Sequence, residues 1–325
     1  MKRSLFFVFS FFLAASSKAN NEELFRFEGK SYRESDLPPA LRQSMFELDR
    51  QRYDTVTRLV DSFLLELYVK EEAQKKGKKP EELEQQLFKG KTVNEKDAQT
   101  WYDANKSRVG GRSFDSIKGE IVNFLQMQEQ EDAQQLVLKS IKGKGTFQLA
   151  VTEPIAPQVS ITTDAYPSKG SEKAKVTIVE FADYGCPHCK HAAESLKKVV
   201  EKNKKNVRFV YMDFPLNPSG VPKQVAVGAV CADEQKKFWD YHYMAFENQA
   251  SLSKESPAEF AKKLNLDLKK FEACLNSVGT KEKVEFSRNE GERIGVGGTP
   301  SIYINGRKQF GYDQETLEEA IKKLL

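Results

Sequence analysis

Residues 175–202 read KVTIVEFADYGCPHCKHAAESLKKVVEK. The first seven, 175–181, are rich in β-branched and aromatic side chains and predict a buried β-strand. Residues 190–202 place leucine and valine at the spacing of one helical face and predict a helix. Between strand and helix, the CPHC motif at 186–189 sets two thiols two residues apart. Such thiols can form a disulfide with each other and exchange it with another protein.

A CxxC pair supports either thiol–disulfide exchange or zinc binding. A structural zinc site needs four ligands, but the sequence has no second CxxC and only two histidines outside the motif, His191 and His242. We therefore expect neither a metal nor another cofactor. A CxxC between a strand and the start of a helix is typical of a thioredoxin-like redox centre.

The N-terminal residues have the pattern of a secretory signal peptide. Basic residues 2–3 precede an apolar run over 5–15, and residues 17–19 suit cleavage after Ala19. The run is too short for a membrane span, with a permanent anchor as the alternative. Removal of 1–19 leaves 48 basic and 47 acidic side chains, a balance that suggests no nucleic-acid partner. We expect an exported, soluble protein that suits a Gram-negative periplasm.

The sequence before the CPHC motif is mostly helical in pattern. Apolar side chains spaced three and four apart, together with capping residues, predict helices over 52–73, from Pro80, over 94–104 and over about 114–141. Residues 153–170 hold three prolines among Ser and Thr, which indicates an extended linker. We therefore expect a mostly α-helical domain over 20–152, followed by a linker over 153–170.

Four stretches of this half are FEGKSYRESDL, LVDSFLLELYVKEEAQKKGKKPEEL, VNEKDAQTWYDANKS and FDSIKGEIVNFLQMQEQEDAQQLVLKSIKGKGTFQL. Their order over residues 22–152 resembles the N-terminal region of SurA/PrsA-type exported foldases. The resemblance implies a chaperone-like or dimerising module. A helical spacer with no binding role is the alternative, because neither a catalytic residue nor a parvulin prolyl-isomerase domain is visible.

The sequence after the CPHC motif alternates between strands and helices. Residues 206–212 predict a second strand, and the pattern from 215 to about 294 is helical. Residues 299–304 return to strand character, and Asn305-Gly306 predicts a hairpin turn. Asp313 can cap a final helix.

This order of elements resembles the DsbA family. The resemblance rests on VTIVEFADYGCPHCKHAAESLKKV, VRFVYMDFPL, CADEQKKFWDYHYMAFENQ, LDLKKFEACLNS and GERIGVGGTPSIYINGR, and it covers about residues 160–325. It implies an α/β domain over 171–325, a thioredoxin fold with an inserted α-helical subdomain at about 215–294.

The motif residues take roles that follow from their position and from the resemblance. Cys186 is expected to be the exposed nucleophile, because a helix start favours a thiolate. Cys189, one turn into the helix, is the resolving thiol. His188 can stabilise the thiolate, and Pro187 suits the first helical turn. A stable thiolate makes the disulfide form a strong oxidant.

Three further features extend the expected site. Thr299-Pro300 matches the family loop that faces the CxxC with a cis proline and pairs with a substrate strand, the alternative being an ordinary turn. Glu180, inside an apolar strand, is expected to be buried with a raised pKa, or else to face solvent. The resemblance implies that an acidic residue at this position relays the proton of the buried cysteine. The resemblance also implies a structural disulfide between Cys231 and Cys274, with two free thiols or a second redox pair as alternatives.

Three functions are consistent with these features. The first is a thiol oxidase that introduces disulfides into unfolded exported proteins and is recycled by a membrane redox partner. The second is a disulfide isomerase or reductase acting on misfolded proteins, which a homodimer through the N-terminal domain would favour. The third is a chaperone with a vestigial redox role, against which the intact CPHC argues. His188 favours the oxidase.

Overall fold

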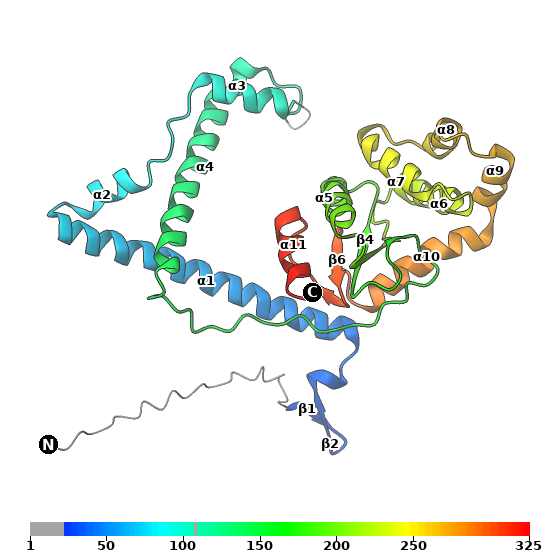
Figure 1. Cartoon of the computed structure of the whole chain (residues 1–325), viewed down its shortest axis with the longest axis horizontal. Helices are drawn as coiled ribbons and strands as arrows, with labels where there is room; N and C mark the ends of the chain where they lie inside the picture. The colour runs from blue at the N-terminus through cyan, green and yellow to red at the C-terminus, as the bar shows by residue number, and fades with distance from the viewer. Residues whose placement is uncertain (1–22, 107–108) are drawn as a thin grey trace. The chain divides into compact units, whose positions relative to one another are not determined.

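The computed structural model describes residues 23–106 and 109–325, so the expected signal peptide over 1–19 lies outside the described residues. The chain divides into two compact units (Figure 1). The first contains the described residues up to Glu47 together with Ile155–Leu325, and the second is Leu48–Pro154. Helix α1 (Pro39–Lys76) begins in the first unit and ends in the second.

The first unit is built on a five-stranded sheet with the order β3-β5-β4-β6-β7. The strands are β3 (Ser168–Gly170), β4 (Val176–Ala182), β5 (Val207–Asp213), β6 (Ser301–Ile304) and β7 (Arg307–Lys308). The two central strands, β4 and β5, are parallel, and the other neighbours pair antiparallel. Both central strands are buried on both faces, which is why their sequences are nearly continuous apolar runs.

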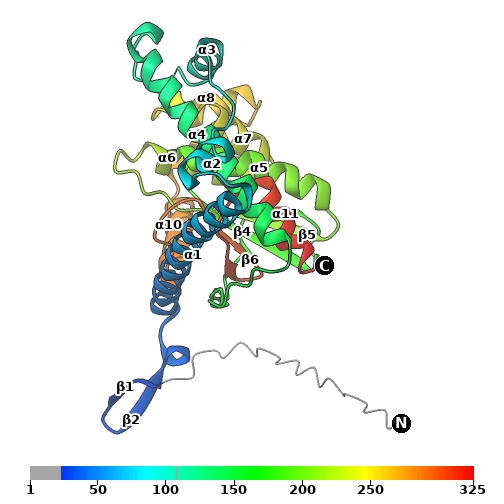
Figure 2. The same ribbon diagram turned by 90° about the vertical axis from the view of Figure 1, so that its left-hand side faces the viewer.

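Helices cover both faces of this sheet. Helix α5 (Pro187–Asn203) connects β4 to β5 and lies beside α11 (Gln314–Lys322) in both views (Figures 1 and 2). Their apolar side chains, including Leu196 and Leu317, join one core cluster. The opposite face packs Phe181 and Tyr303 against residues that follow β5 and α10, among them Phe214 and Ile294.

The helical insertion, defined here as Val221–Arg293, lies between β5 and β6. Its elements are α6 (Val221–Glu234), α7 (Phe238–Glu247), the 3₁₀ turn η2 (Gln249–Ser251), α8 (Ser256–Lys263), α9 (Leu268–Asn276) and α10 (Val278–Arg293). The predicted class, a thioredoxin fold with an inserted helical subdomain and a helical N-terminal region, is confirmed.

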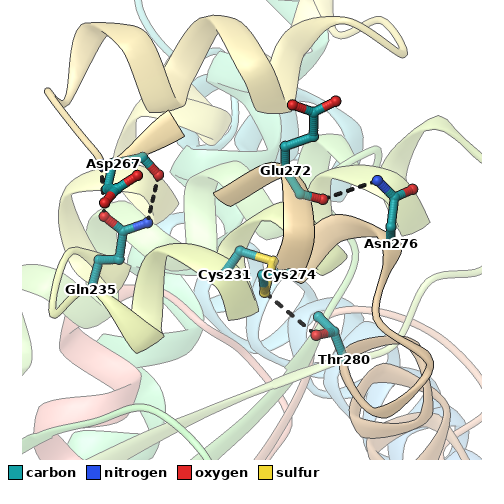
Figure 3. Close-up of a disulfide and its surroundings, with 7 residues drawn as sticks. All are labelled: Cys231, Gln235, Asp267, Glu272, Cys274, Asn276 and Thr280. Atoms are coloured by element: carbon teal, nitrogen blue, oxygen red, sulfur yellow. Dashed lines mark hydrogen bonds between the residues drawn. A yellow bond between two sulfur atoms is a disulfide. The ribbon is translucent and has the colours of Figure 1, made fainter. Parts of the chain in front are cut away.

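A disulfide joins α6 to α9 inside the helical insertion (Figure 3). The sulfur atoms of Cys231 and Cys274 are 2.06 Å apart, and the Cys274 sulfur lies 3.4 Å from the Thr280 hydroxyl. Beside it, Gln235 of the chain just after α6 exchanges hydrogen bonds with the backbone of Asp267, the N-cap of α9. The pairing implied by the family resemblance is therefore present in the structure.

Residues 155–170 belong to the first unit, although the sequence predicts an extended linker over 153–170. Val159 and Tyr166 are buried against the sheet, and the Val159 N–H donates to Gly306 O at 2.9 Å. The Thr162 N–H donates to the Glu290 carboxylate at 2.8 Å, and β3 pairs with β5. Prolines keep this segment extended, but its apolar side chains and backbone groups find partners on the sheet.

The described residues before Glu47 also belong to the first unit, whereas the sequence predicts a helical domain from residue 20. They form a hairpin of β1 (Glu23–Phe27) and β2 (Lys30–Arg33), visible in Figure 2, then a 3₁₀ turn (Glu34–Asp36). Helix α1 starts at Pro39, well before the predicted residue 52. Its buried Phe46 packs on Phe310 with ring centroids 5.5 Å apart.

The second unit is helical, as the sequence predicts. It contains the rest of α1 with α2 (Pro80–Leu87), α3 (Glu95–Ala104) and α4 (Phe114–Gly143). Asn94 caps α3 by accepting hydrogen bonds from the N–H groups of Lys96 and Asp97. Two small apolar clusters hold the unit together, one around Leu65 and Leu138 and one around Ala98 and Ile117.

Candidate active site

The CPHC motif lies where β4 passes into α5. Cys186 is the N-cap residue of α5, and Pro187 occupies its first position. Buried Asp183 holds the turn before the motif, because its carboxylate accepts hydrogen bonds from the N–H groups of Gly185 at 2.7 Å and Leu216 at 2.8 Å. The nucleophile candidate is thus fixed at the positive end of a helix.

The Cys186 thiol is half-buried and has an acidic pKa. The pKa of Cys186 falls from the ordinary value of 9.0 to about 5. The largest cause is a hydrogen bond from the Cys189 thiol, which outweighs the opposing effect of burial. The Thr299 side chain and the N–H groups of Cys189 and His188 lower this pKa further. The sulfur of Cys186 lies 3.2 Å from the carbonyl oxygen of Thr299. At neutral pH this group is therefore a thiolate.

The Cys189 thiol has the opposite character. It is fully buried, and burial raises its pKa far above the usual range. Its hydrogen bond to Cys186 and the charge of Glu180 act in the same direction. One turn of helix therefore separates an accessible thiolate from a buried thiol that holds its proton, and both thiols are free in this structure.

Glu180 faces the interior beneath the motif. It lies on β4 opposite Tyr211 of β5 and Ile302 of β6, with 0% of its surface exposed. Burial, followed by the negative charge of Cys186, raises the pKa of Glu180 to about 8. Neither carboxyl oxygen has a hydrogen-bond partner among the described residues. A carboxyl group with a pKa of about 8 holds its proton at neutral pH and can give this proton up and later regain it.

The Thr299-Pro300 bond is cis, and its loop faces Cys186. His188 is exposed, and its Nδ1 lies 2.7 Å from the hydroxyl of Tyr312, which precedes α11. The structure thus brings the predicted residues of the motif, Glu180 and this loop into one site. The Cys231–Cys274 disulfide belongs to the helical insertion and is separate from this site.

Four residues of the site were not predicted from the sequence. Asp213 ends β5, and burial, followed by the charge of Asp183, raises its pKa to about 7. A carboxylate at the end of a buried strand was a usable signal for Asp213. No local signal marks Tyr312 or Gln249, which reach the motif from segments distant in the sequence. Asp183 is separated from Cys186 only by Tyr184 and Gly185 and was readable as a turn residue.

Within residues 23–106 and 109–325, no group of three or more His, Cys, Asp or Glu side chains is arranged to hold a metal ion. In the same part of the chain, no helix is long and apolar enough to cross a membrane.

The family model described as Thioredoxin matches residues 162–323, about half of the chain, and these residues contain the whole site. The chain is 29% identical over 169 residues to the probable disulfide bond formation protein D of Bacillus anthracis, covering 49% of this chain and 77% of that protein. The disulfide bond formation protein D of Bacillus subtilis is also 29% identical, with 48% and 77% covered.

Other similar proteins carry a different name. The chain is 30% identical over 176 residues to the Na(+)/H(+) antiporter NhaA 1 of Salinispora arenicola, covering 53% of this chain and 27% of the antiporter. The chain thus spans only about a quarter of such relatives. Among solved structures, oxidised BdbD from Bacillus subtilis has a TM-score of 0.48 and 23% identity, with 52% of this chain and 97% of that chain covered.

Proposed function

Residues 162–323 belong to the thioredoxin family, and from this premise we propose that the protein is a thiol:disulfide oxidoreductase that introduces disulfides into folding proteins. The observation that carries the proposal is the contrast between the two thiols of the CPHC motif. Cys186 is accessible with a pKa of about 5, whereas Cys189 is buried with its pKa raised.

This contrast favours oxidation of the substrate over its reduction. A pKa near 5 stabilises the reduced form as a thiolate, so the Cys186–Cys189 disulfide readily accepts electrons. Cys186 is also the better leaving group of the two, which helps to release the finished substrate. The printed names of the Bacillus relatives, disulfide bond formation proteins, agree with this direction.

The proposed reaction begins from the oxidised protein. A substrate thiolate attacks the Cys186 sulfur, the Cys186–Cys189 bond breaks, and a mixed disulfide forms. Cys189 leaves as a thiolate and takes up a proton. A second substrate thiolate then attacks the substrate sulfur of the mixed disulfide, and Cys186 leaves as a thiolate. Two electrons pass from the substrate dithiol to the protein, and the substrate gains one disulfide.

Other residues of the site have roles in these steps. Glu180, with a pKa of about 8, is suited to supply the proton that Cys189 takes up. The Thr299-Pro300 loop, 3.2 Å from the Cys186 sulfur, is suited to hold a substrate strand beside it. Exposed His188, oriented by Tyr312, can stabilise the thiolate.

The cellular setting is part of the proposal. An exported protein would meet folding chains that still carry free thiols, and a membrane redox partner would reoxidise Cys186 and Cys189. The signal-peptide pattern over 1–19 and the Cys231–Cys274 disulfide support an oxidising compartment. The dimerising or chaperone-like role of the N-terminal half stays a prediction.

The test compares the activity of the purified protein on reduced ribonuclease and on scrambled ribonuclease, and it also measures the reduction potential of the protein. We expect an oxidising potential and rapid formation of disulfides in reduced ribonuclease. A weakly oxidising protein that rescues scrambled but not reduced ribonuclease would identify an isomerase and overturn the proposed direction.

A further inference from the structure

Gln249 connects the helical insertion to the turn that carries Cys186. This residue begins η2, which is separated from α7 by Asn248 alone. Its side-chain amide nitrogen reaches two backbone oxygens of the motif turn. The nitrogen lies 2.9 Å from the carbonyl oxygen of Tyr184 and 2.8 Å from that of Cys186. One carboxamide therefore binds the backbone on both sides of Gly185.

The backbone carbonyl of Cys186 belongs to the nucleophilic residue and is also the first hydrogen-bond acceptor of α5. It accepts from the N–H groups of Cys189 at 3.1 Å and Lys190 at 3.4 Å. The amide of Gln249 is an additional donor to the same oxygen. A donor here reduces the negative potential that the carbonyl dipole places near the Cys186 sulfur, and it restrains the backbone that aims this sulfur.

The position of Gln249 is itself fixed by the core of the helical insertion. In α7, which precedes it, Phe246 packs on Tyr184 with ring centroids 4.9 Å apart. His242 of the same helix lies 3.2 Å from the Tyr184 hydroxyl through its Nδ1. The end of α7 is thus tied to the motif turn by packing and hydrogen bonding, so the amide of Gln249 is held in place rather than moving freely.

We infer that Gln249 is a positioning residue through which the helical insertion stabilises the Cys186 thiolate and thereby makes the disulfide form more oxidising. The inference rests on the proposed function, since it concerns the same exchange reaction. It gives the insertion a part in the chemistry besides covering the sheet.

Two substitutions remove this contact in different ways. Gln249→Leu keeps the approximate size but removes the donor, and Gln249→Glu replaces the donor with a negative charge facing two carbonyl oxygens. Ser251→Ala is the matched control. Ser251 lies in the same turn. Its hydroxyl donates a hydrogen bond to the backbone carbonyl of Asn248 at 3.1 Å and makes no side-chain bond to the motif turn among the described residues.

The readouts are the thiolate pKa of Cys186 and the equilibrium constant with glutathione. Gln249→Glu is expected to raise the pKa by about one unit. At neutral pH this corresponds to about a tenfold weaker oxidant, or about 30 mV. Gln249→Leu should shift both quantities in the same direction by less, and Ser251→Ala should shift neither.

The outcomes separate this inference from the proposed function. An unchanged pKa and equilibrium constant in folded Gln249→Leu and Gln249→Glu would overturn the inference. Equal loss of melting temperature in oxidised and reduced forms, with an unchanged pKa, would show a purely structural role and overturn it too. If Gln249→Glu does not fold, Gln249→Leu decides. A wild-type protein without exchange activity would instead overturn the proposed function.

Discussion

The two cysteine pairs of this protein occupy contrasting environments. Cys186 and Cys189 are free thiols one helical turn apart, at the start of α5. Cys231 and Cys274 are 43 residues apart in sequence and bonded to each other between α6 and α9. Only 1% and 7% of their surfaces are exposed, whereas Cys186 is partly exposed.

Placement in the fold, rather than the presence of two sulfurs, decides what each cysteine pair does. At the helix start, access, hydrogen-bond donors and burial give two neighbouring thiols very different pKa values. In the helical insertion, burial removes access, and the bond restrains the chain. The first pair is suited to exchange electrons and the second to stabilise the fold.

The largest expected effect comes from removing the nucleophile. Cys186→Ser should reduce exchange to the uncatalysed rate, because serine cannot form the mixed disulfide. Cys189→Ser should also fail to oxidise a reduced substrate, because Cys186 then has no partner for a disulfide. Its Cys186 thiolate should instead attack the disulfides of scrambled ribonuclease, release a substrate thiolate and remain as a mixed disulfide that no Cys189 resolves. Substrate oxidation rates and non-reducing gels measure these outcomes. Full activity of Cys186→Ser would contradict the assignment of the first pair and favour a chaperone role.

A smaller loss is expected for Glu180→Gln, which keeps the shape of the side chain but cannot transfer a proton. The step in which Cys189 exchanges its proton should slow by roughly a hundredfold. Stopped-flow measurement of mixed-disulfide formation and resolution separates this step from the others. An unchanged rate would show that solvent, and not Glu180, serves Cys189.

Glu180→Gln should also change how the stability of the folded protein depends on pH. The pKa of Glu180 is raised from 4.5 to about 8 in the folded protein, so the unfolded chain ionises first as pH rises. Wild-type stability should therefore decline between about pH 4.5 and 8 relative to Glu180→Gln. Urea unfolding across this range measures the difference, and parallel curves would contradict the burial of Glu180.

The smallest effect on exchange is expected when the second pair is removed. Changing both Cys231 and Cys274 to Ala should lower the unfolding free energy by about 4 kcal/mol in the chain-entropy model. Exchange by the folded variant should stay close to that of the wild type. Chemical denaturation and the ribonuclease assay test both parts. A large loss of exchange in folded protein would show that the two pairs are not independent.

Much of the first unit was predictable because its signals are local. The strand over 175–181 is observed as Val176–Ala182, and the helical pattern over about 215–294 contains the observed Val221–Arg293. Glu180 was predictable as a buried acid because its neighbours along the strand are apolar. Family resemblance supplied the cis Thr299-Pro300 bond and the Cys231–Cys274 pairing, both present in the structure.

The features of the fold and the site that were not predicted depend on contacts between residues far apart in the chain. Val159 and Tyr166 bind residues 155–170 to the sheet, although the prolines of this segment indicate a linker. Tyr312 reaches the motif from a loop and Gln249 from the short 3₁₀ turn η2, and neither segment has a periodic pattern. The pKa of Cys186 likewise depends on Thr299, which is distant in sequence. Such pairings follow from the folded arrangement and have no local signature.

The most direct test of the account is a pH titration of the Cys186 thiolate in the reduced protein, followed by ultraviolet absorbance with the oxidised protein as baseline. We expect one thiolate to appear with a midpoint of about 5. Because this pKa lies below the ordinary value of 9.0, the stability of the reduced form relative to the oxidised form should increase as pH rises from about 5 to 9. As pH falls, this gain should decline and be absent below about 5. A midpoint near 9 would contradict the proposed oxidising centre.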